Sequence, residues 1–297
     1  MRISASASPI PSLTGNYTFY NNVNYGPYNT QVIDFFIPTS GTPTGIVIYL
    51  HGGGFVVGDQ KNAYDNPDFI TRIQSYLDNG IAYASATYRK MSISNEREGL
   101  SRVVECGSQL IDFLVDIATD CNLDVNKIGF SCSSGGNGPI VHHMHYGSVD
   151  LNCLYLGAPQ ATYDSLQWDT ILEEEDYDIL QQIDDSSATK NTYFRGLGIR
   201  NVDQLYTPST IILRDYLNYL NKPLSITIGE AYLWTLNDPT PLSSVTIASH
   251  HYKHILSLKD KLVAAGVTTL VNIPNAPLPY TETNTETEEE FFLRKLT

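Results

Sequence analysis

Residues 127–137 hold serines in a pattern that could carry out acyl chemistry. They read as an apolar strand, a turn of small residues and then a helix. A serine at such a tight corner needs small neighbours, so that its hydroxyl stands clear at the helix N-terminus. The frame Ser131-x-Ser133-x-Gly135 meets this need, with serine in place of the usual first glycine, and makes Ser133 the candidate nucleophile. The alternative frame, starting at Gly129, would leave its serine inside the strand.

A second stretch is a glycine run that follows a continuous apolar segment, residues 46–50. An apolar run of this length is typical of a strand buried on both faces. It ends in His51-Gly52-Gly53-Gly54. Successive glycines let the backbone approach a ligand and direct its N–H groups inward, as an oxyanion hole requires. A glycine turn without a chemical role is the alternative interpretation.

Together, the two motifs make the sequence similar to the hormone-sensitive-lipase-like carboxylesterases, which have the α/β-hydrolase fold. The resemblance covers roughly residues 25–297 and rests on His51-Gly52-Gly53-Gly54 and Cys132-Ser133-Ser134-Gly135-Gly136-Asn137, with weaker support from residues 86–89 and 264–267. In that family the glycine run also precedes the serine corner. The resemblance implies that Ser133 is the nucleophile and that the N–H groups of Gly53, Gly54 and Ser134 form the oxyanion hole.

The partners that a catalytic serine needs are missing from their expected positions. A serine hydroxyl is a poor nucleophile unless a base takes its proton and an acid orients that base. The resemblance places the base at Leu278 and the acid at Tyr232, and neither side chain can serve. Glu230 and Asp238 are candidates for a substitute acid, with Asp164 as a third.

Histidines elsewhere in the chain could replace the missing base. Two groups lie after the serine motif: His142, His143 and His145, and then His250, His251 and His254. The first group follows Ser133 on its own predicted helix, about 14 to 18 Å along the axis, so it is expected to serve packing or the surface. For the second group the sequence favours a solvated or interface role over a relocated base. The resemblance implies that His51 shapes the oxyanion loop.

Two classes of function therefore stay open. The first is a hydrolase that acts on small or medium carboxylic esters beneath a cap. The second is a catalytically silent protein of the same fold, which binds a neutral small molecule or assembles with a protein partner. An apolar Leu278 and an aromatic Tyr232 favour the second class, because they suit a neutral ligand. Neither class requires a metal or a cofactor.

The composition limits the partners of this acidic protein. The formal net charge of −14 argues against nucleic acid and against anionic membrane surfaces, because both would be repelled. Neither a signal peptide nor a membrane-spanning segment is visible, so a soluble protein is expected. The four cysteines, Cys106, Cys121, Cys132 and Cys153, are spaced neither as metal ligands nor as a dense disulfide framework. Cys132 and Cys153 lie in expected core strands, so free buried thiols are expected.

Apolar runs and helical periodicities alternate along most of the chain. This alternation predicts an α/β protein with a mostly parallel, doubly wound sheet and helices on both faces. Residues 1–30 lack periodicity and predict an extended N-terminal arm. We expect residues 31–160 and 223–297 to form the α/β-hydrolase core. Residues 161–222 break the rhythm and are too long for a tight connection, so they predict a largely helical cap insertion.

Overall fold

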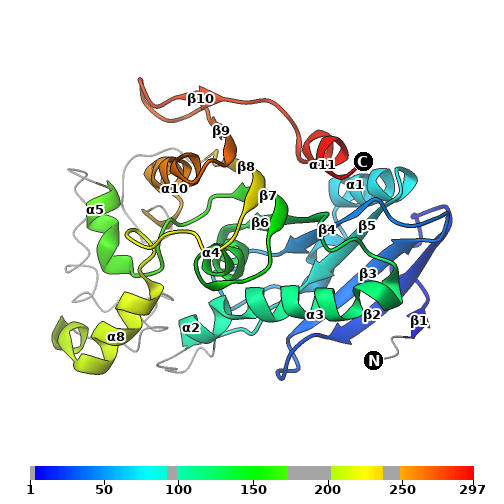
Figure 1. Ribbon diagram of the computed structural model, residues 1–297, viewed down its shortest axis with the longest axis horizontal. Helices are drawn as coiled ribbons and strands as arrows, with labels where there is room; N and C mark the ends of the chain where they lie inside the picture. Colours follow the sequence, from blue (N-terminus) through cyan, green and yellow to red (C-terminus); the bar gives the residue numbers. More distant parts are fainter. Residues whose placement is uncertain (1–3, 92–98, 173–201, 237–247) are drawn as a thin grey trace.

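The computed structural model describes residues 4–91, 99–172, 202–236 and 248–297. These residues form a ten-stranded sheet in the order β1-β2-β3-β5-β4-β6-β7-β8-β9-β10 (Figure 1). The strands are β1 Ala5–Ser6, β2 Tyr17–Asn24, β3 Val32–Pro38, β4 Gly45–Leu50, β5 Ile81–Ala86, β6 Ile128–Ser133, β7 Leu151–Gly157, β8 Ile228–Trp234, β9 Thr268–Ile273 and β10 Glu282–Thr283. Strands β4 to β9 pair in parallel, and the strands at both edges pair antiparallel.

Helices cover both faces of this sheet, as the alternating pattern predicts. The α-helices are α1 Pro67–Asp78, α2 Gly99–Val104, α3 Cys106–Cys121, α4 Asn137–Tyr146, α5 Trp168–Leu172, α8 Pro208–Leu217, α10 Tyr252–Ala264 and α11 Glu288–Leu296. Short 3₁₀ turns are η1 Gln60–Ala63, η2 Ser134–Gly136, η3 Ser165–Gln167 and η5 Val202–Tyr206. Helices α1 and α11 lie together on one face, whereas α3, α4 and α10 pack on the other. The predicted fold class is therefore confirmed.

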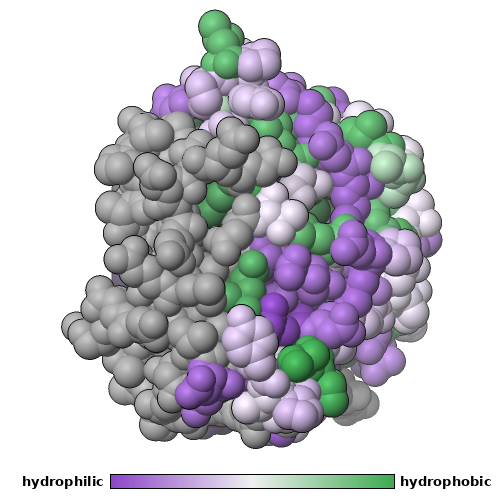
Figure 2. Space-filling model, turned by 90° about the vertical axis from the view of Figure 1, so that its left-hand side faces the viewer, coloured by the Kyte–Doolittle hydropathy of each residue, from purple (hydrophilic) through white to green (hydrophobic). Residues whose placement is uncertain are grey.

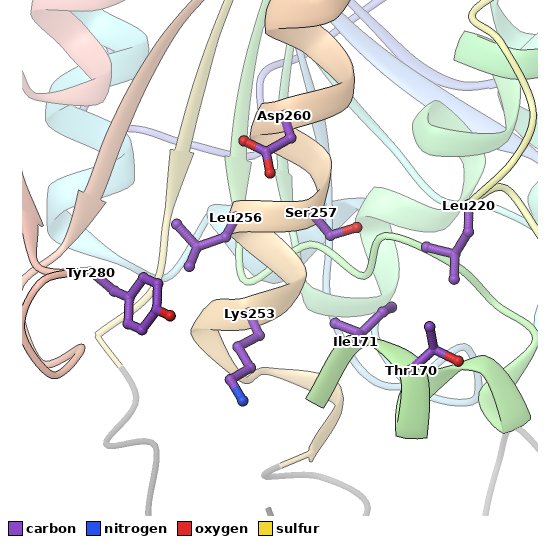
Figure 3. A pocket seen from close by; sticks show the side chains of 8 residues that line it. All are labelled: Thr170, Ile171, Leu220, Lys253, Leu256, Ser257, Asp260 and Tyr280. Atoms are coloured by element: carbon purple, nitrogen blue, oxygen red, sulfur yellow. The ribbon is translucent and has the colours of Figure 1, made fainter. Parts of the chain in front are cut away.

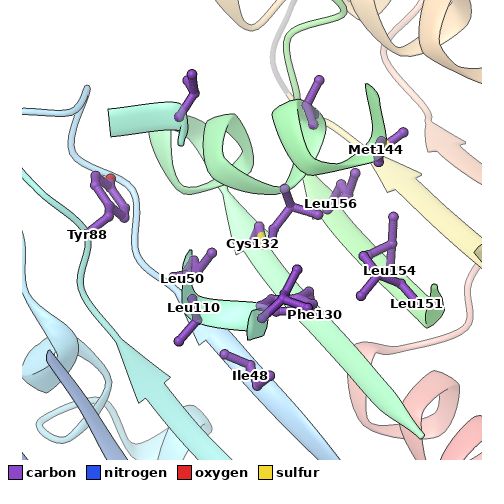
Figure 4. Close-up of a cluster of buried hydrophobic side chains, with 14 of the residues drawn as sticks. Ile48, Leu50, Tyr88, Leu110, Phe130, Cys132, Met144, Leu151, Leu154 and Leu156 are labelled. Atoms are coloured by element: carbon purple, nitrogen blue, oxygen red, sulfur yellow. The ribbon is translucent and has the colours of Figure 1, made fainter. Parts of the chain in front are cut away.

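The larger hydrophobic core lies between the sheet and α3, α4 and α10. Figure 4 shows its centre, where alternate side chains of the parallel strands meet those of the helices: Ile48, Leu50, Leu110, Phe130, Cys132, Met144, Leu151, Leu154 and Leu156. Cys132 lies in this layer at 2% exposure, and all four cysteines are buried and free, as the sequence predicts. None of the helices in the described ranges is long and apolar enough to cross a bilayer.

Several elements differ from the sequence prediction. The predicted arm, 1–30, contains β2, which pairs antiparallel with β3 and so belongs to the sheet. Apolar residues at helical spacing over 100–117 predict one long helix, but the structure divides it at Glu105 into α2 and α3. The apolar pattern of residues 224–230 predicts a strand, but the structure has it from Ile228 to Trp234.

The predicted cap, residues 161–222, is described only in part. Its described elements are η3, α5, η5 and α8, and residues 173–201 lie outside the described ranges. Helix α8 begins at Pro208, a favoured first helical residue, and exposes Ile211 and Ile212 at 48% and 71%. Figure 2 shows that, at this end of the molecule, hydrophobic side chains on the described surface stand among hydrophilic ones.

Candidate active site

The sharp corner after β6 lies one residue later than the sequence predicts. Ser133 is the last residue of the strand and has extended backbone angles, φ −135° and ψ 135°. Ser134 opens the following turn with φ 49°. A positive φ is uncommon for a residue with a side chain and is often found at functional corners. The corner expected at Ser133 is therefore at Ser134, in the frame Cys132-x-Ser134-x-Gly136.

Ser133 itself points toward the other face of the sheet. Successive side chains of a strand alternate between faces, so Ser133 shares its face with Ser131. Ser131 lies on the side of Glu288 of α11, whose pKa burial raises and the nearby Arg72 and Ser131 side chains lower. Cys132, between the two serines, lies in the core on the opposite face. The hydroxyl of Ser133 thus belongs to the α11 side of the sheet.

The frame centred on Ser134 is supported by how closely Gly136 approaches β4. A Cβ atom on Gly136 would lie 2.3 Å from the carbonyl oxygen of Leu50 and 2.6 Å from that of His51. A Cβ atom on Gly135 would lie 3.2 Å from the backbone nitrogen of Gly54. Both glycines let the turn after Ser134 pack directly on the end of β4 and the glycine loop that follows it.

Replacing Gly136 with alanine is expected to destabilise the protein by about 3 kcal/mol, at the upper end of the range for overpacking. The added methyl group would meet backbone oxygens, which cannot move aside as a flexible side chain could. Gly266→Ala is the control, because Gly266 has φ 80° but open space around it, so about 1 kcal/mol is expected. Urea unfolding measures both losses. An equal or smaller loss for Gly136→Ala would contradict the close approach.

The hydroxyl of Ser134 contacts an imidazole. Its Oγ lies 2.8 Å from Nε2 of His250, which precedes α10. Burial lowers the pKa of His250 below its ordinary value of 6.5. The ring is therefore neutral near pH 7, and a neutral ring nitrogen without a proton can accept one from a hydroxyl.

The expectation that His250, His251 and His254 are solvated or at an interface is wrong. His251 is 2% exposed, and its Nδ1 accepts a hydrogen bond from the N–H of Lys253 at the start of α10. His254 is fully buried against Trp168. The sequence placed a relocated base at His250 second to a solvated or interface role, because nothing in the local pattern at residue 250 shows that its ring meets a serine 116 residues earlier.

The first group of histidines lies on α4, and its three rings serve packing, as expected. His142 Nδ1 lies 2.9 Å from the Tyr219 hydroxyl, and His145 Nδ1 lies 2.9 Å from the Pro223 carbonyl oxygen. His143 pairs with the Ser108 hydroxyl at 2.9 Å. These contacts join α4 to α3 and to the segment that leads into β8. The three rings therefore have structural partners away from Ser134.

The glycine loop after β4 faces the corner at Ser134. Gly53 and Gly54 have φ values of 113° and 56°. Within the described part of the chain, their N–H groups donate no hydrogen bond. The Gly53 carbonyl accepts bonds from Val56 and Val57, both at 3.1 Å, and so closes the turn. Two N–H groups are thus left available near Ser134, as an oxyanion hole requires.

His51 holds this loop in place from beneath. Its Nε2 lies 2.8 Å from the Thr87 hydroxyl, and its Nδ1 lies 2.6 Å from the Gly52 carbonyl oxygen. Its ring stacks on Tyr88, and the Tyr88 hydroxyl donates to the His51 carbonyl at 2.9 Å. These bonds suit the loop-shaping role that the resemblance implies.

The positions expected for the base and acid hold side chains with other contacts. Tyr232 is buried, stacks on Tyr155, and donates its hydroxyl to the Asn284 carbonyl oxygen at 2.6 Å. Leu278 is 86% exposed in the loop between β9 and β10. Neither side chain is placed to serve the hydroxyl of Ser134.

The substitute acids proposed from the sequence do not approach this histidine. Glu230 pairs with Arg294 at 2.8 Å and with Lys295 at 3.2 Å, on the α11 face of the sheet. The Arg294 and Lys295 cations hold its pKa below the ordinary value against the opposing effect of burial. Asp164 forms a two-pronged pair with Arg214 of α8, at 3.0 and 3.3 Å.

Asp238, the remaining candidate acid, lies outside the described residues. Among the described residues, no carboxylate forms a hydrogen bond with His250. The site that these residues define is therefore a serine and a histidine beside a glycine loop.

A separate hollow of about 330 Å³ runs between α5 and α10 (Figure 3). Its lining is Thr170, Ile171, Leu220, Lys253, Leu256, Ser257, Asp260 and Tyr280. The Lys253 ammonium donates to the Leu172 carbonyl oxygen and so ties α10 to α5. Neither Ser134 nor His250 lines this hollow. It lies at the boundary between the core and the described part of the predicted cap.

Comparison with known proteins bears on the glycine loop and the serine corner. Residues 33–152 match the BD-FAE family model, a family of α/β-hydrolases. This segment runs from β3 to the first residues of β7 and contains both motifs. No curated protein sequence matches the chain at a significant level.

Solved structures with the same fold include esterases and lipases. Esterase B from Lactobacillus rhamnosis is 14% identical with a TM-score of 0.58, covering 94% of this chain and 83% of that protein. An esterase/lipase from an uncultured bacterium is 14% identical with a TM-score of 0.55, covering 95% and 84%. A lipase/esterase from Lactobacillus plantarum is 12% identical with a TM-score of 0.51, covering 99% and 96%. At these identities the likeness shows a shared fold.

Proposed function

We propose that this chain, which shares the fold of esterases and lipases and whose residues 33–152 match a family of α/β-hydrolases, hydrolyses small carboxylic esters with Ser134 as nucleophile and His250 as base. The nucleophile that the sequence predicts at Ser133 is thus assigned to Ser134. The observation that carries the proposal is the 2.8 Å contact between Ser134 Oγ and His250 Nε2. A nucleophile and its base must lie within such a distance for proton transfer.

The proposed reaction uses the contacts around the corner in two steps. Neutral His250 takes the proton as the Ser134 oxygen attacks the ester carbonyl, and the imidazolium then protonates the leaving alcohol. Water, deprotonated by the same ring, releases the acid and restores the serine. The N–H groups of Gly53 and Gly54 stabilise the oxyanion, joined by that of Gly135, which directly follows the nucleophile in the observed frame.

Catalytic silence is the competing candidate, and a specific observation favours it. The two positions at which the resembling family holds its acid and base carry Tyr232 and Leu278, with their own contacts or solvent exposure. Removing the acid from a Ser-His-Asp triad lowers kcat about 10⁴-fold in the trypsin-like case. A silent protein would keep the fold and bind a neutral small molecule or a protein partner without turnover.

Labelling with a fluorophosphonate distinguishes the two candidates. Wild type is expected to take up one equivalent, mapped by mass spectrometry to Ser134, and to hydrolyse a short-chain nitrophenyl ester. Ser133→Ala is the matched control and should label as wild type does, because its hydroxyl lies on the α11 face. Ser134→Ala should do neither. If folded wild type is not labelled, the silent protein is favoured. If Ser133→Ala loses labelling, Ser133 is the nucleophile.

A further inference from the structure

A buried side-chain amide connects the segment that holds His250 to the exit of β7. Nε2 of Gln160 donates to the Ala158 carbonyl oxygen at 2.9 Å and to the Ser249 carbonyl oxygen at 2.8 Å. Gln160 is 0% exposed, so water does not compete for these bonds. Because Ser249 directly precedes His250, the second bond fixes the main chain at the base.

A second buried amide connects the serine corner to the same strand exit. Nδ2 of Asn137 donates to the carbonyl oxygens of Ser134 and Gly157, both at 2.8 Å. Asn137 is also 0% exposed. Gly157 is the last residue of β7, and Gln160 lies three residues beyond it. The exit of β7 therefore supports the serine on one side and the histidine on the other.

Neighbouring contacts make this strand exit rigid. Ala158 has φ 48° and donates its N–H to the Trp234 carbonyl oxygen at 2.7 Å, which ties it to the end of β8. The Thr235 hydroxyl then donates to the His250 carbonyl oxygen at 3.4 Å. The main chain on both sides of the imidazole is thus held by β7 and β8, although the ring itself comes from a loop.

The unused atoms of both amides also bear on their role. Asn137 Oδ1 and Gln160 Oε1 are buried and have no hydrogen-bond partner among the described residues. A buried acceptor without a partner costs stability, of the order of 1 to 3 kcal/mol. The two side chains thus supply pairs of donors to main-chain carbonyls at a stability cost, as expected of groups that fix geometry.

We infer that Gln160 and Asn137 are positioning residues, which set the distance between Ser134 and His250 through the exit of β7. The inference rests on the proposed function. Productive geometry tolerates displacements of about 0.5 Å, and a misplacement of about 1 Å can cost about 100-fold in rate. Neither residue touches the reacting atoms. The loss of either is expected to act on kcat through the imidazole and the serine hydroxyl.

Gln160→Met tests this role, because methionine keeps the size of the side chain and removes both donors. A roughly 100-fold fall in kcat is expected, with KM little changed, and fluorophosphonate labelling of Ser134 should slow in proportion. Gln31→Met is the matched control. Gln31 is also 0% exposed and hydrogen-bonds Cys106 and Gln109, so it should lose stability but keep wild-type kcat.

A double variant distinguishes the positioning role of Gln160 from a purely structural role. If Gln160 positions His250, then in a His250→Gln background Gln160→Met should lower kcat no further, while its effect on the melting temperature persists. If Gln160→Met does not fold, Thr235→Val carries the test, with an expected 3- to 10-fold fall in kcat from losing one bond to the His250 carbonyl. If wild type is labelled but the folded variant, Gln160→Met or Thr235→Val, keeps wild-type kcat, the positioning role alone is overturned. Unlabelled wild type overturns the proposed function, and this inference falls with it.

Discussion

His250→Gln is expected to lower kcat for a short-chain nitrophenyl ester about 10²- to 10⁴-fold, the range that a general base contributes. The substitution keeps a polar side chain of similar reach but removes the nitrogen that accepts the Ser134 proton. The fluorophosphonate should react more slowly by a similar factor, since it needs the same activated hydroxyl. Wild-type kcat/KM in folded His250→Gln would contradict the assignment of the base.

The control for this substitution is His143→Gln. His143 is buried in α4 and bonded to Ser108 and to the Val149 carbonyl oxygen, so the change tests the loss of a buried imidazole without touching the site. Its kcat is expected to stay within about threefold of wild type.

In wild type, the acidic limb of kcat/KM should lie below pH 6.5, because burial lowers the pKa of His250 and keeps the base neutral there.

The central strands could be predicted from the sequence because their residues are apolar on both faces. Strand β4, Gly45–Leu50, covers the apolar run at residues 46–50 that predicts it. Such runs are decided locally, by burial of each side chain in turn. Strand β2, second from the edge, was missed because its Ser-, Asn- and Tyr-rich surroundings carry no comparable signal, and pairing with β3 determines it.

The serine corner was misplaced by one residue for a tertiary reason. Two adjacent serines fit a small-residue turn about equally well, and the sequence offered no means to count the last residue of the strand. Ser133 pairs with Gly157 of β7, which extends β6 by one residue. The approach of Gly136 to the Leu50 carbonyl then places the turn at Ser134. Both constraints come from neighbouring strands.

The acid candidate Glu230 shows a similar limit. It lies two residues before the position at which the resemblance places the acid, but it stands within β8 and its carboxylate is bound by Arg294 and Lys295. Those cations lie 64 and 65 residues later, on α11. A carboxylate's partner is decided by the packing of the helix that carries it, which residue spacing does not encode.

Lowering the pH from 7 to 5 is expected to destabilise the protein by several kcal/mol. Burial lowers the pKa of all seven histidines. The pKa values of His142 and His254 fall to about 3, and those of His145 and His251 to about 4. In the unfolded chain these rings titrate near pH 6.5, so near pH 5 it binds protons that the folded chain does not. The histidine contribution is fully present above pH 6.5 and is lost as the pH falls.

The size of the loss follows from proton linkage. Each extra proton bound on unfolding changes the free energy of unfolding by about 1.4 kcal/mol per pH unit. Burial raises the pKa values of Asp34, Asp164 and Glu288, which opposes the histidines at acidic pH. A net uptake of about two to three protons near pH 5 gives a slope of about 3 to 4 kcal/mol per pH unit, against a typical total stability of about 5 to 15 kcal/mol.

Urea unfolding at pH 7, 6 and 5 measures this slope directly. His142→Gln removes one buried ring, with its bonds to Tyr216 and Tyr219, and should flatten the slope by about 1.4 kcal/mol per pH unit. Gln31→Met is the control: it loses buried hydrogen bonds but no titrating group, so its stability should fall equally at each pH. Equal wild-type stability at pH 7 and 5 would show that the unfolded chain gains no such protons. The histidines that pack α4 and α10 against the sheet would then contribute nothing to the acid sensitivity of the fold.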